Sequence, residues 1–96
     1  MEMSVLYDIL VAELGYSEYE AKVTVNDLAT LQEQFQSALK KWVATREETE
    51  IVIESISSTK LIQEKKFTYP AALIALDWVA TDPETAIPVL TSDIRQ

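Results

Sequence analysis

The 96-residue sequence predicts an all-α fold, built as a compact bundle of about five to six helices. Nearly half of the residues (48%) are apolar, which is enough for a core and too many for a disordered chain. Only one glycine and three prolines are present, whereas a sheet-rich protein needs frequent turn residues. A chain of this length buries roughly 60 to 70% of its unfolded surface, so we expect one helical domain, residues 1–96.

Helix caps and the spacing of apolar residues give the expected order of elements. The predicted helices cover approximately residues 4–14, 17–25, 27–44, 46–57, 59–67 and 69–81, followed by a short turn at 83–87 and a frayed tail at 91–96.

The first predicted helix begins at a Ser4 cap and ends at Gly15, which can adopt the left-handed conformation. Between these residues only Asp8 and Glu13 are charged, so the helix is apolar on nearly all sides. Such a helix has to lie at the centre of a core or against another chain.

A capping box starts the second element, because Ser17 and Glu20 are spaced so that each can bind the other's free backbone N–H. A short strand is the alternative for residues 17–25, since Val23 and Val25 alternate with polar residues.

The stretch LGYSEYEAKV (residues 14–23) also resembles the first helix of the TrmB-type winged-helix transcription regulators. The similarity covers about ten of the 96 residues and consists of Leu14, Gly15, Ser17, Glu20, Ala21 and Val23. It implies a DNA-binding regulator with a recognition helix and a hairpin wing. No glycine-marked pair of alternating strands predicts that wing, so we interpret the stretch as a generic, well-capped helix start.

The most regular apolar pattern predicts the helix at 27–44, with Asn26 and Asp27 as cap residues. At helical spacing one sector of about 140° collects seven apolar side chains, which we interpret as core. They are Leu28, Leu31, Phe35, Ala38, Leu39, Trp42 and Val43.

Residues 46–57 fit a helix better than a strand, because neither face of a strand would be uniformly apolar. Thr45 and Glu48 have the spacing of a capping box. In a helix, Glu47, Glu50 and Glu54 line one face, and we predict them as a candidate partner-facing acidic strip.

A serine-rich turn then leads into a short basic helix at 59–67, which carries Lys60, Lys65 and Lys66. Three lysines without arginine or asparagine make a weak DNA recognition helix. We expect Lys65 and Lys66 to complement a helix C-terminus instead.

The helix at 69–81 has Thr68 as its cap and Pro70 in its first turn, where a missing N–H costs nothing. Asp77 is its one charged residue and gives two alternatives: a carboxylate on a narrow solvent-facing strip, or a buried or ligand-contacting carboxylate. We expect Pro88 to stop the next helical turn.

The composition excludes several kinds of chemistry. Cysteine and histidine are both absent, which removes disulfides, zinc sites of the Cys/His kind and triads that use imidazole as the base. No glycine-rich phosphate-binding loop is present. We therefore expect a protein that is not an enzyme, with no catalytic residue, cofactor or metal.

The net charge of −8 is concentrated near the start, where residues 1–35 hold seven acidic residues and one lysine. Such a surface repels phosphates, so we expect no nucleic-acid partner. The first residues lack the basic start of a secretory signal, and no apolar run reaches the roughly 20 residues that span a bilayer. We expect a cytoplasmic protein without membrane contact.

Two helices that are apolar on nearly all sides exceed what one short chain can cover, so the sequence predicts a homodimer. The expected function is that of a small acidic helical protein–protein interaction or accessory protein, whose partner protein the sequence does not identify. One alternative is an acidic decoy or inhibitor of a nucleic-acid-binding protein, with the glutamate strip imitating phosphates. A second alternative is a helix-turn-helix-like regulator.

Overall fold

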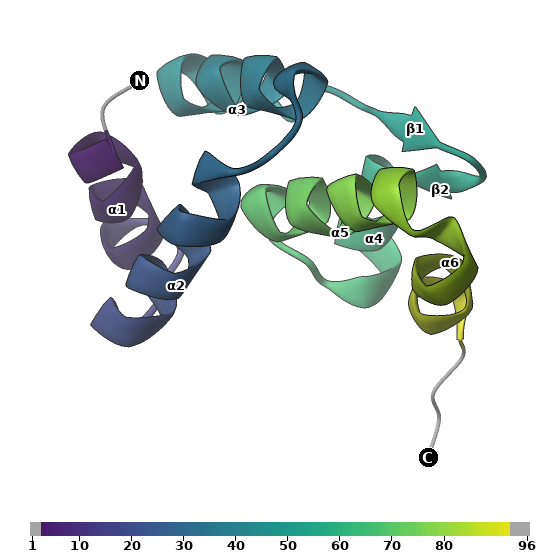
Figure 1. Cartoon of the computed structure of the whole chain (residues 1–96). Coiled ribbons are helices and arrows are strands. Elements are labelled where there is room, and N and C mark those ends of the chain that lie inside the picture. The colour runs from purple at the N-terminus through teal and green to yellow at the C-terminus, as the bar shows by residue number, and fades with distance from the viewer. Residues whose placement is uncertain (1–2, 93–96) are drawn as a thin grey trace. The chain divides into compact units, whose positions relative to one another are not determined.

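The computed structural model describes residues 3–92 and divides the chain into two compact units, residues 1–49 and 50–96. The described residues form six helices and one two-stranded antiparallel sheet (Figure 1), which confirms the predicted all-α class. The two units are called unit 1 and unit 2 below, and each is described by itself. The assignment of the chain to a single domain stays a prediction.

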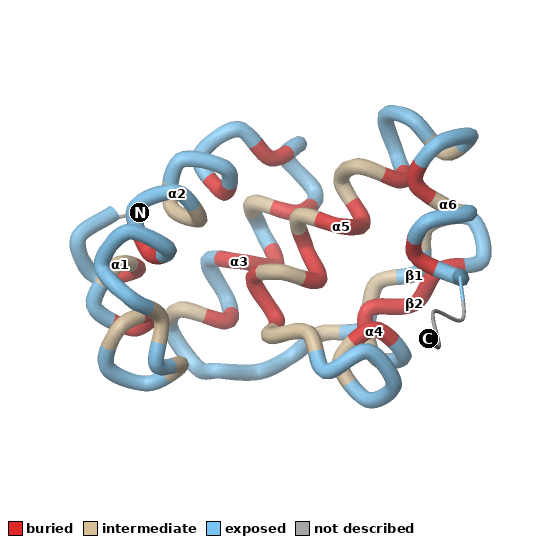
Figure 2. Tube along the Cα trace, turned by 90° about the horizontal axis from the view of Figure 1, so that it is seen from below, coloured by how far each residue is buried: buried red, intermediate tan, exposed pale blue. Residues whose placement is uncertain are grey.

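Unit 1 consists of three helices, α1 (Met3–Ala12), α2 (Glu18–Ala29) and α3 (Glu33–Thr45). Helix α1 packs against both α2 and α3. The buried apolar side chains of the three helices and the α2–α3 turn are Leu6, Ile9, Leu10, Ala21, Leu28, Leu31, Phe35, Ala38, Leu39 and Trp42 (red in Figure 2). Of the predicted apolar stripe, only Val43 is half-buried rather than buried.

The turn between α1 and α2 follows the local prediction. Gly15 adopts a left-handed φ of +76°, and the Tyr16 amide donates to the Leu10 carbonyl at 3.0 Å. The capping box is present in both directions: the Ser17 amide donates to Glu20 Oε1 and the Glu20 amide to Ser17 Oγ, each at 3.0 Å. The strand alternative for 17–25 is therefore wrong, and the capped helix is confirmed.

The predicted helix at 27–44 is wrong at its start, because α2 continues to Ala29 and α3 begins only at Glu33. Gln36 explains the break: its side-chain amide donates to the Leu28 carbonyl at 2.8 Å and to the Leu31 carbonyl at 3.3 Å. These carbonyls are satisfied without a continuing helix. Apolar periodicity did not reveal the break, because the stripe is buried on both sides of it.

An ion pair between Arg46 and Glu13 links the end of α3 to the end of α1. Arg46 follows the helix with a left-handed φ of +64°, and its Nε and Nη2 donate to Glu13 Oε1 and Oε2 at 2.8 and 2.6 Å. Its guanidinium also lies 5.4 Å from the centre of the Trp42 ring. The left-handed Arg46 ends the helix here, so the predicted capping box of Thr45 and Glu48 does not form.

Unit 2 begins with a hairpin, which corrects one expectation. The predicted helix at 46–57 is wrong: residues 46–51 form no helix, and β1 (Val52–Ile53) pairs antiparallel with β2 (Ile56–Ser57). No glycine marks the turn of this hairpin. Glu54 takes a φ of +58°, a conformation usually left to glycine or asparagine.

Ser58 explains why this segment is extended instead of helical. Its Oγ accepts from the Ile51 amide, and its own amide donates to the Ile51 carbonyl, both at 2.9 Å. Ser58 is buried, so these bonds hold residue 51 beside residue 58 and fold the residues between them back into the hairpin. A serine side chain competes in this way with helical hydrogen bonding.

The central helix of unit 2 is α5 (Tyr69–Thr81), which matches the prediction at both ends. Thr68 Oγ1 accepts from the Ala71 amide at 3.3 Å, and Pro70 lies in the first turn. Helix α5 packs against α4 (Ser58–Lys65), α6 (Pro83–Thr91) and the hairpin. The enclosure expected for this apolar helix is therefore present within the chain.

Two boundaries in unit 2 differ from the prediction. Helix α4 covers 58–65 instead of 59–67, since Lys66 takes a left-handed φ of +64°. Pro88 does not stop the element predicted at 83–87, because α6 includes it and ends at Thr91. In a helix that starts at Pro83, this proline leaves only the exposed Glu84 without its i+4 amide. Of the tail predicted at 91–96, residues 93–96 lie outside the described residues.

Candidate protein-binding groove

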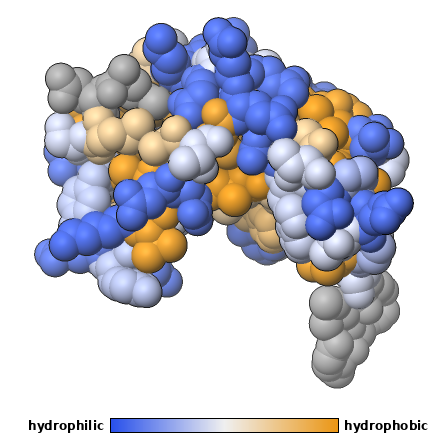
Figure 3. Space-filling view, in the orientation of Figure 1, coloured by the Kyte–Doolittle hydropathy of each residue, from blue (hydrophilic) through white to orange (hydrophobic). Residues whose placement is uncertain are grey.

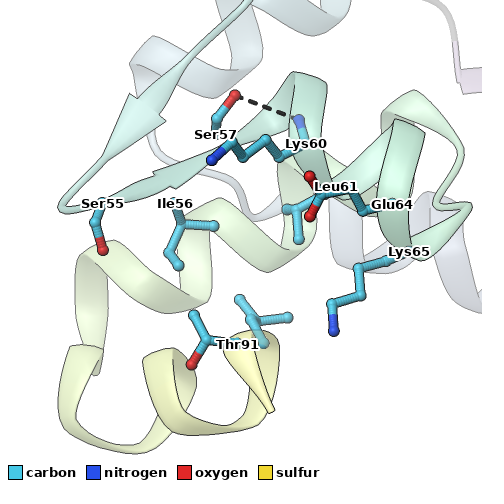
Figure 4. Close-up of a pocket in the computed structure, with 9 residues that line it drawn as sticks. Ser55, Ile56, Ser57, Lys60, Leu61, Glu64, Lys65 and Thr91 are labelled. Carbon is cyan, nitrogen blue, oxygen red and sulfur yellow. Dashed lines mark hydrogen bonds between the residues drawn. The ribbon is translucent and has the colours of Figure 1, made fainter. Parts of the chain in front are cut away.

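An open groove in unit 2 lies between β2, α4 and α6, with a volume of about 420 Å³. Its floor is apolar: Ile56, Leu61 and Leu90, one from each element, have exposed fractions of 6%, 3% and 8%. Figure 4 shows Ile56 and Leu61 pointing into the space between the strand and the helices. The volume falls within the roughly 300 to 1,000 Å³ of typical ligand sites, and an apolar floor suits an apolar side chain.

The rim of the groove is polar and exposed. Lys60, Glu64 and Lys65 come from α4, Ser55 from the hairpin turn and Thr91 from the end of α6. The lining therefore carries a net positive charge within a chain of net charge −8. An anionic group beside an apolar one is the chemistry that this combination favours.

Lys60 and Lys65 differ in the hydrogen bonds of their ammonium groups. Lys65 Nζ donates to the Ser92 carbonyl at the end of α6, at 2.9 Å. Lys65 thus complements a helix C-terminus, as expected, although the helix is α6 rather than its own. Over residues 3–92, the Lys60 ammonium has no ion-pair or hydrogen-bond partner, so it can bind an anion without first losing a bond.

Ser57 is the last residue of β2 and the N-cap of α4, so it positions two of the elements that line the groove. Its Oγ accepts from the Lys60 amide at 3.4 Å, as the cap of α4, and donates to Glu50 Oε2 at 2.9 Å (Figure 4 shows the first bond). A strand that ends in a helix cap brings Ile56 and Lys60 to the same opening. Neither this cap nor the return of α6 beside β2 and α4 was predicted from the sequence.

The predicted acidic strip is not built as expected, because the helix that would have aligned Glu47, Glu50 and Glu54 is absent. All three residues are exposed, and each has a different setting. Glu47 pairs with Lys41 at 3.3 Å, Glu50 accepts from Ser57, and Glu54 forms the hairpin turn. Their contact with a partner stays a prediction, without the shared helix face that suggested it.

Asp77, the other candidate site residue, lies half-buried on α5 and does not line the groove. Its neighbour Thr81 is exposed and uses its hydroxyl to donate to the Asp77 and Trp78 backbone carbonyls, both at 3.1 Å. The partial burial of Asp77 is intermediate between the two alternatives, and a role in ligand contact stays a prediction.

Among residues 3–92, the pKa shifts that are resolved belong to one ion pair in unit 1, Glu13 and Arg46. The hydrogen bond from Arg46 lowers the pKa of Glu13, and the same bond raises the pKa of Arg46. Both side chains are at the surface, so the pair joins the residue after α1 to the residue after α3 without forming a reactive site. Among residues 3–92, no cluster of three or more acidic side chains is placed to hold a metal ion.

Comparison with known proteins adds no relative: no family model, no curated protein and no solved structure matches the chain. Within the described residues, no helix is long and apolar enough to cross a membrane.

Sequence reasoning missed the groove because its floor comes from three elements. Ile56 was assigned to a helix that does not form, and Leu90 to a segment beyond an expected helix stop. One signal was available, since Lys60, Lys65 and Lys66 form a basic cluster in an acidic chain. That cluster marked α4 as unusual without showing what lies beside it.

Proposed function

We propose that this protein is a small interaction protein without catalytic activity, and that it binds a segment of a partner protein in the groove between β2, α4 and α6. The observation that carries the proposal is the apolar floor of Ile56, Leu61 and Leu90 beneath a rim with two lysines. An apolar anchor with acidic neighbours is the kind of segment that such a surface recognises.

The groove supports this function better than it supports the two alternatives. A decoy for a nucleic-acid-binding protein needs aligned acidic groups, and Glu47, Glu50 and Glu54 have separate settings. A DNA-binding regulator needs a basic surface, whereas α4 carries its lysines beside Glu64 in a strongly acidic chain.

Site-specific photocrosslinking tests the proposal. A benzoylphenylalanine residue replaces Thr91 at the groove rim, and a matched control replaces Thr85, an exposed threonine of α6 outside the lining. After irradiation in cells, the Thr91 variant should form adducts with a polypeptide, and the Thr85 variant should form few or none. Equal adducts from both positions, or none from either, would contradict the proposal.

A further inference from the structure

The outward face of α2 carries the most exposed large apolar side chain of the described residues. Tyr19 has an exposed fraction of 77%, and Val23, one turn later, has 42%. At about 100° per residue these two positions and Asn26 lie opposite the buried Ala21 and Leu28. Tyrosine beside an aliphatic residue is typical of interface cores, and here the pair lies open to solvent.

Acidic residues flank this face. Glu20 and Asp27 lie along one side of Tyr19 and Val23, and both are exposed. The face therefore offers apolar side chains next to carboxylates, which is the combination that the groove of unit 2 favours. Lys22 and the exposed Glu18 lie on the other side with opposite charges, so the net negative charge is on the flank of Glu20 and Asp27.

We infer that the groove between β2, α4 and α6 binds a second copy of this chain through the outward face of its α2, with Tyr19 over the apolar floor and the flanking carboxylates toward Lys60 and Lys65. This inference rests on the proposed function and names the partner. It also assigns the predicted homodimer to two particular surfaces.

Charge and shape both support a second copy as the occupant. The groove lining is net positive, whereas the first 35 residues carry seven acidic residues and one lysine. The floor is concave, and the α2 face is a helix surface with a protruding Tyr19. Figure 3 shows apolar surface (orange) between hydrophilic surface (blue) over α1 and α2. Each copy has one groove and one such face, so a second copy can supply the α2 face that the groove of the first binds.

Two surface variants separate the halves of the contact. Tyr19→Ser removes the apolar anchor, and Lys60→Glu reverses the charge at the groove; both residues are exposed and neither has a described side-chain partner, so folding should be retained. Sedimentation velocity at micromolar concentrations should give about twice the monomer mass of 10.8 kDa for the wild type. Each variant should weaken the pair by about tenfold or more, as loss of a central interface residue does.

Mixing the two variants is the decisive step. The Tyr19→Ser chain keeps an intact groove and the Lys60→Glu chain keeps an intact α2 face, so one complete contact forms in the mixed pair. The mixture should therefore contain more dimer than either variant alone. Val52→Ser, at an exposed apolar residue of β1 outside the groove, is the matched control and should leave the wild-type mass unchanged.

Three results would overturn the inference: a monomeric wild type, variants that associate as strongly as the wild type, or a mixture with no more dimer than its components. Circular dichroism of each variant confirms that helix content is unchanged. A monomeric wild type together with specific Thr91 adducts to a different protein would leave the proposed function standing and remove only the second copy as its partner.

Discussion

Unit 1 and unit 2 each contain one helix that is apolar on nearly all sides, and the two helices have different surroundings. In α5 most apolar side chains are buried, with α4, α6 and the hairpin as neighbours, while Ile74 and Trp78 are half-buried. In α1 only Leu6, Ile9 and Leu10 are buried, while Met3 and Val5 are exposed at 36% and 45%. An apolar sequence therefore does not by itself predict assembly, because what matters is how many elements cover it.

This difference changes the argument for a homodimer. The sequence suggested that both helices carry more apolar surface than one chain can hide, and α5 is the better covered of the two, with seven buried residues against three in α1. On α1 and α2 of unit 1, Met3, Val5, Tyr19 and Val23 remain exposed. The following four predictions test this contrast between a covered and an uncovered helix, and the contacts that produce it.

The largest effect is expected from a cavity in the covered helix. Leu73→Ala in α5 removes a side chain with no exposed surface and should lower the free energy of unfolding by about 2 to 5 kcal/mol. Val5→Ala in α1 removes a half-exposed side chain and should change it by less than about 0.5 kcal/mol. Urea denaturation measures both. Similar losses would show that the two helices are equally covered.

The α2–α3 break depends on Gln36. Gln36→Ala removes two hydrogen bonds, to the Leu28 and Leu31 carbonyls, and should cost about 1 to 3 kcal/mol. Gln34→Ala, at an exposed position of the same helix, is the control and should have little effect. Thermal unfolding gives the comparison. A Gln36→Ala chain as stable as the control would mean that another contact determines the break.

In the hairpin turn of unit 2, Glu54 adopts a left-handed backbone conformation that favours glycine. Since Glu54 holds a positive φ, Glu54→Gly should stabilise the chain by about 1 kcal/mol. Ser55→Gly, at the next residue, has no positive φ to relieve and should not stabilise it. Equal or opposite shifts in the midpoint of urea unfolding would argue against the turn geometry.

The smallest effect is expected at the exposed ion pair between Glu13 and Arg46 in unit 1. Because the folded-state pKa of Glu13 is lowered by Arg46, the pair stabilises the fold above the unfolded-state pKa of a glutamate. That contribution is lost as the pH falls through the folded-state pKa. The difference in unfolding free energy between the wild type and Glu13→Gln should thus be present at neutral pH and disappear at acidic pH. Glu18→Gln is the control, and a difference independent of pH would contradict the coupling.

Local chemistry made parts of the fold predictable. The Ser17–Glu20 capping box and the Thr68 cap with Pro70 involve residues a few positions apart, so the sequence contains all that is needed to recognise them. Helix α5 was predicted with its correct bounds for this reason. The buried stripe of α3 was also predictable, since periodic apolar residues face a core wherever the helix begins.

Contacts between distant residues made the rest unpredictable. Gln36 reaches back eight residues to end α2, and Ser58 binds Ile51 to form a hairpin without glycine. The candidate glutamate strip depended on the helix that this hairpin replaces. The groove needs α6 to return beside β2 and α4, and no pattern within one element shows that return.

The central claim is that the groove and the outward face of α2 are the contact surfaces, and the most direct measurement is a concentration series of amide NMR spectra of the wild-type chain. Signals from residues at the groove and around Tyr19 and Val23 should shift together and fit one dissociation constant. The chemical shifts of Met3 and Val5, on the exposed flank of α1, should not change. Shifts confined to that flank, or none over the whole series, would contradict the account.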